Sequence, residues 1–141
     1  MLHLPLHPMV VHFPIALFVS ALGLEFLSLI LKKESLHQTA LQIYILASVV
    51  APLVAWTGLE EAEELHLVKH PVLDLHRALA LFTMGLALVT LPILWIAKKR
   101  IAHSFRVIFF IFLVLVVSAV TFTDYNGGRL VYEYGVGVEE K

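Results

Sequence analysis

Histidine is the residue type in this chain that is best suited to do chemistry. The sequence holds eight histidines and no cysteine, which excludes disulfides, thiolate zinc sites, iron–sulfur clusters, c-type haem attachment and cysteine nucleophiles. Neutral imidazole binds haem iron, zinc, copper and non-haem iron. A redox or metal centre in this chain would therefore depend on histidine.

Two histidine-containing stretches resemble each other. The first begins at His7 and reads HPMVVHFPIALF, and the second begins at His70 and reads HPVLDLHRALALF. Each contains His-Pro, a second histidine after four or five intervening residues, and then Ala-Leu-Phe. We interpret this as a weak internal duplication that matches His12 with His76 and His7 with His70. The duplication predicts that His12 and His76 lie at the same depth on helices running in the same direction.

Two histidines at matched depth suit a b-type haem, because the iron takes one axial ligand from each side of the porphyrin. Neighbouring helices lie about 8–10 Å apart, so a diagonal pair in a four-helix bundle is roughly 11–14 Å apart, enough for two imidazoles and an iron. We therefore expect haem b between the first and third helices, with His12 and His76 as iron ligands. His7 and His70 would form a second ligand pair or bind the haem propionates.

A bare metal site is the alternative. His66 and His70 are four residues apart, which places both on one helical face, and the acidic run 60–64, including Glu63, lies just before them. These residues could bind a zinc, copper or iron ion without haem. A solvated acidic loop and a cofactor-free structural subunit of a respiratory complex are the other interpretations. No HExxH motif and no catalytic residue is apparent, so we expect an electron-transfer or binding protein rather than a standalone enzyme.

The composition indicates the elements that must position these histidines. The chain has 141 residues, of which 60% are apolar and 15% charged, whereas soluble domains average about 45–50% apolar and about 25% charged. A membrane-spanning helix needs about 20 apolar residues. The sequence predicts a single all-α integral membrane domain over 1–141, with helices at about 9–31, 36–59, 74–97 and 104–123 in two repeated hairpins. A polar tail follows at 124–141.

The basic residues predict the orientation. Six of the ten Lys and Arg residues fall in the first and third connections, so the positive-inside rule makes both connections cytoplasmic. Both termini and six of the eight histidines then lie on the outer side. Glu25 falls in the inner half of the first helix, where it would contact a proton or a quinol, or extend toward Lys32 and Lys33 at the membrane surface.

The segment HPMVVHFPIAL at 7–17, together with GGRLVYEYGVGV at 127–138, resembles the small prokaryotic predicted membrane proteins grouped as domain of unknown function 2231. The resemblance covers essentially the whole chain. It implies four helices in a prokaryotic inner membrane and an association with redox proteins. We accordingly expect the protein to lie in the lipid bilayer, to contact a cytochrome or a quinone as its redox partner, and to form a homo-oligomer. We expect no binding to nucleic acid.

The tail departs from the family pattern at one position. Members often end in LVYxHGVGV, whereas Tyr134 stands here in place of that histidine, so we leave the tail out of the ligand set. Its glycines permit backbone turns that other residues resist. The sequence predicts a short strand over 130–136 that folds across the outer end of the bundle.

Overall fold

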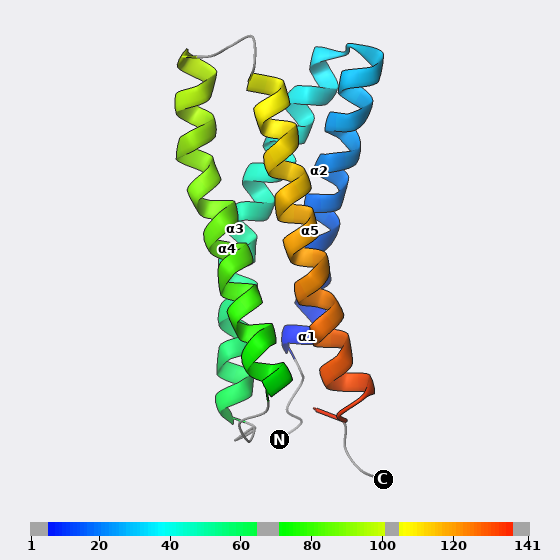
Figure 1. The fold of residues 1–141 in the computed structure, drawn as a ribbon, viewed down its shortest axis with the longest axis vertical. Helices are drawn as coiled ribbons and strands as arrows, with labels where there is room; N and C mark the ends of the chain where they lie inside the picture. The colour runs from blue at the N-terminus through cyan, green and yellow to red at the C-terminus, as the bar shows by residue number, and fades with distance from the viewer. Residues whose placement is uncertain (1–5, 65–70, 101–104, 137–141) are drawn as a thin grey trace.

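The computed structural model describes residues 6–64, 71–100 and 105–136. Throughout these ranges the regular structure is helical, and Figure 1 shows a bundle of long, roughly parallel rods. The elements are α1 (Leu6–Val10), α2 (His12–Leu31), α3 (Glu34–Glu64), α4 (Pro71–Arg100) and α5 (Phe105–Tyr132). The short α1 continues into α2 through Val11, which has helical dihedral angles. Pro14 lacks the N–H that would bond to the carbonyl of Val10, which accounts for the interruption.

Four helical spans are long and apolar enough to cross a membrane: Leu6–Leu31, Glu34–Glu63, Pro71–Ile96 and Phe105–Tyr132. The two shortest have 26 residues, which at about 1.5 Å per residue gives about 39 Å. The hydrocarbon core of a bilayer is about 30 Å thick. The prediction of an all-α bundle of four membrane helices is confirmed.

The helices pack in a ring. Each of α2 and α4 packs against both α3 and α5, so α2 and α4 lie on one diagonal of the bundle. In Figure 1 α1 and the start of α4 lie at one end, with the ends of α3 and α5 beside them. We call this the terminal end and the other, where α2 turns into α3, the loop end. Both α2 and α4 therefore run from the terminal end to the loop end.

Three helix boundaries differ from the prediction. Helix α3 continues through the acidic run to Glu64, α4 begins at Pro71, and α5 continues to Tyr132 instead of ending near 123. A hydropathy pattern marks the part of a helix that lies in lipid. A helix that satisfies its own backbone hydrogen bonds can extend beyond that region with polar residues.

The predicted strand over 130–136 is wrong. Residues 130–132 form the last turn of α5, and Gly135 has a φ of 65°, a left-handed conformation that glycine adopts readily. The chain reverses there, so that the N–H of Val136 donates to the carbonyl of Leu130 at 2.9 Å. Val136 packs against Val72, Leu73 and Leu130. The tail thus ties the end of α5 to the start of α4.

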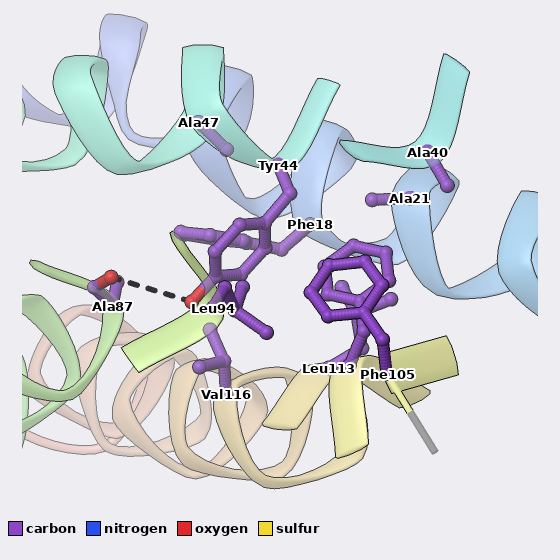
Figure 2. Close-up of a cluster of buried hydrophobic side chains, with 11 residues drawn as sticks. Phe18, Ala21, Ala40, Tyr44, Ala47, Ala87, Leu94, Phe105, Leu113 and Val116 are labelled. Atoms are coloured by element: carbon purple, nitrogen blue, oxygen red, sulfur yellow. Dashed lines mark hydrogen bonds between the residues drawn. The ribbon is translucent and has the colours of Figure 1, made fainter. Parts of the chain in front are cut away.

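The centre of the bundle is filled by large side chains from different helices (Figure 2). Phe18, Tyr44, Phe109 and Leu113 are fully buried, and the ring of Tyr44 lies 5.5 Å from that of Phe109 and 5.7 Å from that of Phe18. Small residues allow the helices to approach around these rings. They are Ala21, Ala40, Ala47 and Ala87.

The two hairpins repeat each other's buried positions. The shift that carries His7 onto His76 also carries four buried positions of α2 onto buried positions of α4, and four buried positions of α3 onto buried positions of α5. In α2 and α4 the pairs are Pro14 and Thr83, Phe18 and Ala87, Ala21 and Thr90, and Glu25 and Leu94. In α3 and α5 they are Ala40 and Phe109, Tyr44 and Leu113, Ala47 and Val116, and Val54 and Thr123. These positions match in the register that pairs His7 with His76, which differs from the register that the sequence suggested.

Candidate functional site

His7 lies partly buried at the terminal end, where α1 packs against α3. Its Nδ1 atom is 3.0 Å from the carbonyl oxygen of Val54 and 3.3 Å from Oγ1 of Thr57. Its backbone N–H donates to Oε2 of Glu61 at 3.1 Å. The first turn of the first hairpin is therefore held against the last turns of the second helix of that hairpin.

His76 occupies the matching place in the second hairpin. It is partly buried in the first turns of α4, and its Nδ1 is 2.9 Å from the carbonyl oxygen of Thr123 in α5. The hydroxyl of Thr123 lies 3.1 Å from that of Thr83. The bond from each histidine spans 47 residues of sequence. The two contacts are therefore the same contact, made once in each half of the duplication.

These contacts fix the tautomer of both rings. A carbonyl oxygen only accepts hydrogen bonds, so the proton of each neutral imidazole lies on Nδ1. Nε2 then keeps its lone pair. Histidines that bind metals usually donate their other ring N–H to a carbonyl or carboxylate in this way, which orients the ring and raises the basicity of the ligating nitrogen. His7 and His76 both have this arrangement.

A glycine lies against each of the two rings. A Cβ atom added to Gly58 would lie 2.8 Å from Cε1 of His7, and one added to Gly127 would lie 3.0 Å from Cε1 of His76. Only a residue without a side chain leaves room for the imidazole there. Sequence reasoning missed this role for both glycines and assigned Gly127 to a turn. The available signal was that each glycine follows its histidine at the same separation.

The expected equivalence of His12 and His76 is wrong. His12 is exposed at the start of α2, and the shift that matches the two hairpins carries it onto Leu81, which is also exposed. His76 has His7 as its counterpart. The match between the two stretches of sequence rested on His-Pro and Ala-Leu-Phe, which recur near the starts of two helices. The register of the packed hairpins is instead fixed by which side chains are buried between helices.

Charged groups surround His76. His7, Asp124 and Arg77 interact electrostatically with it, so both histidines belong to one cluster at the terminal end although they come from different hairpins. Arg77 is adjacent in sequence, and its Nε atom is buried without a hydrogen-bond partner. An unpaired buried guanidinium nitrogen is costly and favours an anionic partner.

The bare metal alternative falls largely outside the described residues. His66 and His70 both lie there. Glu63 is exposed in the last turn of α3, and Glu61 accepts the hydrogen bond from the backbone of His7. Among the residues that the structure describes, no group of three or more His, Asp or Glu side chains could hold a metal ion.

A second polar cluster lies at the loop end. Glu25 is fully buried, and its Oε2 is 2.7 Å from Nδ1 of His37. Its Oε1 is 3.9 Å from Nε of Arg106, and Arg106 also donates to the hydroxyl of Ser28. Glu25 therefore points into the bundle, toward α3 and α5, and does not extend toward Lys32 and Lys33 at the surface. Sequence reasoning singled out Glu25 but missed both of its partners.

The comparison with known families agrees with this architecture. A family model described as a predicted membrane protein (DUF2231) matches residues 3–140. The chain belongs to this family. No curated protein and no solved structure matches it. This DUF2231 protein is thus a membrane protein with four apolar helices, and the two polar clusters at its ends are its candidate sites.

Proposed function

We propose that this DUF2231 protein binds a haem at the terminal end through His7 and His76 and serves in electron transfer. The observation that supports this is the repeated contact in which each Nδ1–H is donated to a helix carbonyl, that of Val54 or that of Thr123. Both histidines were expected to bind a cofactor, but the ligand pair proposed here replaces His12 with His7.

The donor set fits a haem better than a bare ion. A porphyrin supplies four nitrogens, so two imidazoles complete the coordination of its iron. A bare zinc ion needs about four protein or water ligands, and the described residues hold no group of three. The buried Nε of Arg77 has no partner and lies next to His76, where it would pair with a propionate carboxylate.

The helix arrangement also favours this ligand pair. Because α2 and α4 share a diagonal, the first and third spans, at whose starts the two histidines lie, stand on opposite sides of the bundle axis. A haem bound there would supply one-electron redox chemistry. The protein would contribute the two ligands, and the carbonyls of Val54 and Thr123 would hold the imidazoles in the ligating tautomer.

The location of the site relative to the membrane is part of the proposal. The basic residues of the first and third connections favour a cytoplasmic loop end, in the inner membrane of a prokaryote. The haem would then lie near the outer face, where a cytochrome or a quinone would exchange electrons with it.

Absorption spectroscopy tests the proposal. The full chain, purified from haem-replete cells, should show a Soret band and, after dithionite reduction, an α-band. His7→Ala and His76→Ala should each lose the bis-histidine spectrum. His12→Ala is the matched control, because His12 is a histidine of the same segment that is exposed, and this variant should keep the spectrum.

Three outcomes would overturn the proposal. One is the absence of both bands in the purified wild-type chain. Another is loss of the spectrum in His12→Ala together with retention in His7→Ala. The third is metal analysis that finds stoichiometric zinc or copper without haem, which would support the site at His66, His70 and Glu63.

A further inference from the structure

The buried acid of the loop-end cluster, Glu25, has an apolar residue as its counterpart in the second hairpin. The shift that carries His7 onto His76 carries Glu25 onto Leu94 and His37 onto Arg106. Leu94 is 5% exposed and fills its place with hydrocarbon. Replacing a buried ion pair by apolar residues is often neutral or stabilising. The fold therefore does not need a carboxylate at this depth, and an ionisable residue within a membrane span indicates a function.

The charges around Glu25 are incompletely paired. Oε2 is bound to His37, but Oε1 of Glu25 and Nε of Arg106 are buried without a hydrogen bond. Arg106 also interacts with Glu34, its Nη1 lying 3.9 Å from Oε2 of that residue, so its positive charge is shared between two carboxylates. The cluster can therefore accept one further positive charge on the Glu25–His37 pair.

We propose that Glu25 and His37 form a proton-binding site that exchanges protons with the aqueous phase at the loop end. A proton taken from water binds either to the carboxylate of Glu25 or to the imidazole of His37, and the same bond breaks when the proton is released. The guanidinium of Arg106 repels metal cations from this position, and the carboxylate of Glu25 repels anions. A proton can still bind, because it forms a covalent bond with a carboxylate oxygen of Glu25 or a ring nitrogen of His37.

The exposure of the side chains supplies a route. The side chain of Glu25 is 0% exposed, that of His37 is 4% exposed and that of Arg106 is 28% exposed, so of these three side chains Arg106 is the one that reaches the surface of the bundle. The rings of Phe105 and Phe109 meet the imidazole edge-on at 5.7 and 5.8 Å and cover it on the α5 side.

Among the described residues, the charged groups that form ion pairs in this cluster are Arg106 on α5 and, through Arg106, Glu34 on α3. Lys32 and Lys33 follow in the turn after α2, where the carbonyl of Lys33 accepts a hydrogen bond from Ser28. Over the part of α4 whose side chains the structure describes, residues 71–96, the charged residues are Asp74 and Arg77. Both of these lie in the first turns of α4, at the terminal end.

Infrared and NMR spectroscopy of the full chain in lipid nanodiscs test this inference, which does not depend on haem binding. On acidification, one of two signals should appear. Infrared difference spectra should show the C=O band of a buried protonated carboxyl, or NMR spectra of the protein with ¹⁵N-labelled histidine should show a change in chemical shift of the His37 ring nitrogens. Glu25→Gln should abolish the carboxyl band. Glu34→Gln is the matched control, because Glu34 contacts the same arginine but is 64% exposed, and it should keep the band.

A second variant covers the case in which Glu25→Gln does not fold. His37→Gln keeps an N–H donor toward Glu25 but cannot take up a proton. It should change the pH range over which the infrared band of the Glu25 carboxyl appears. The inference is overturned if neither Glu25 nor His37 changes protonation over the pH range in which the chain stays folded. It is also overturned if His37→Gln leaves the Glu25 titration unchanged.

Discussion

The two ends of this molecule differ in whether the two hairpins carry the same residue types at equivalent positions. At the terminal end both halves keep a histidine bonded to a carbonyl and packed on a glycine, His7 with Gly58 and His76 with Gly127. At the loop end one half has the buried acid Glu25, and the other half has Leu94 at the equivalent position. Matched residues suit a ligand that both halves bind together. Unmatched residues suit a site that belongs to one half.

Replacing Glu25 by the residue of the other half should have the largest effect. In Glu25→Leu, the partly buried guanidinium of Arg106 loses its buried counter-charge, and breaking a buried pair costs about 3–5 kcal/mol. Because Arg106 is 28% exposed and keeps Glu34, we expect the lower part of that range for the free energy of unfolding. Unfolding of the purified protein in mixed micelles by SDS measures it.

The double variant Glu25→Leu with Arg106→Leu is the control for this prediction. It removes both charges together and should recover most of the lost stability, since hydrocarbon already fills the equivalent place at Leu94. If Glu25→Leu alone were as stable as the wild type, the loop-end cluster would carry no buried charge pair.

Adding a methyl group at either glycine of the terminal end should have the next largest effect. In Gly127→Ala the new Cβ meets the ring of His76 at 3.0 Å, and in Gly58→Ala it meets the ring of His7 at 2.8 Å. Overpacking of this kind costs about 1–3 kcal/mol. Both variants should lower the melting temperature and weaken the proposed haem spectrum.

Gly128→Ala is the matched control, because it neighbours Gly127 but has no atom within 4 Å of the added Cβ. It should leave the spectrum and the melting temperature close to those of the wild type. An equal loss in Gly128→Ala would mean that glycine in this helix is needed for something other than the histidine. A loss in only one of Gly58→Ala and Gly127→Ala would show that the terminal end is not symmetric.

A smaller effect on the free energy of unfolding is expected from a substitution at Thr90, which lies between the two ends. The hydroxyl of Thr90 hydrogen-bonds to that of Tyr44 and donates to the carbonyl of Ala87 at 2.8 Å, and the Tyr44 hydroxyl lies 3.3 Å from the same carbonyl. Thr90→Val removes both bonds of the Thr90 hydroxyl and leaves the Ala87 carbonyl to Tyr44, so the free energy of unfolding should fall by about 1 kcal/mol. Thr121→Val, at an exposed position, should change it less. Equal losses would contradict a specific role for the Tyr44 hydroxyl.

The smallest effect on stability should come from a substitution that gives the second hairpin the residue found at the equivalent position of the first. Gly85 has no atom within 4 Å of an added Cβ, and its counterpart in the first half is Ala16. Gly85→Ala should stabilise the protein by up to about 1 kcal/mol, the difference in helix propensity between the two residues. A lower melting temperature would show that this face of α4 is covered by something that the single chain does not contain.

Parts of the terminal end were predictable from residue types alone. Polar side chains in an apolar chain collect where water or a ligand can satisfy them, and His7 and His76 were both named as candidates. The helix ends were harder to predict, because the acidic residues 60–64 and the glycines 127 and 128 have the composition of a connection. In the structure they lie within α3 and α5, since the packing of neighbouring helices outweighs weak intrinsic preferences.

The sequence by itself determined that this chain has four membrane-spanning helices and that it cannot use thiol chemistry. These properties follow from composition and from the length of apolar runs. Only the tertiary structure decided that His76 is matched by His7 and not by His12, and that Glu25 faces His37 and Arg106. The physical reason is that the register of two packed hairpins depends on which side chains are buried between helices, and those contacts join residues far apart in the sequence.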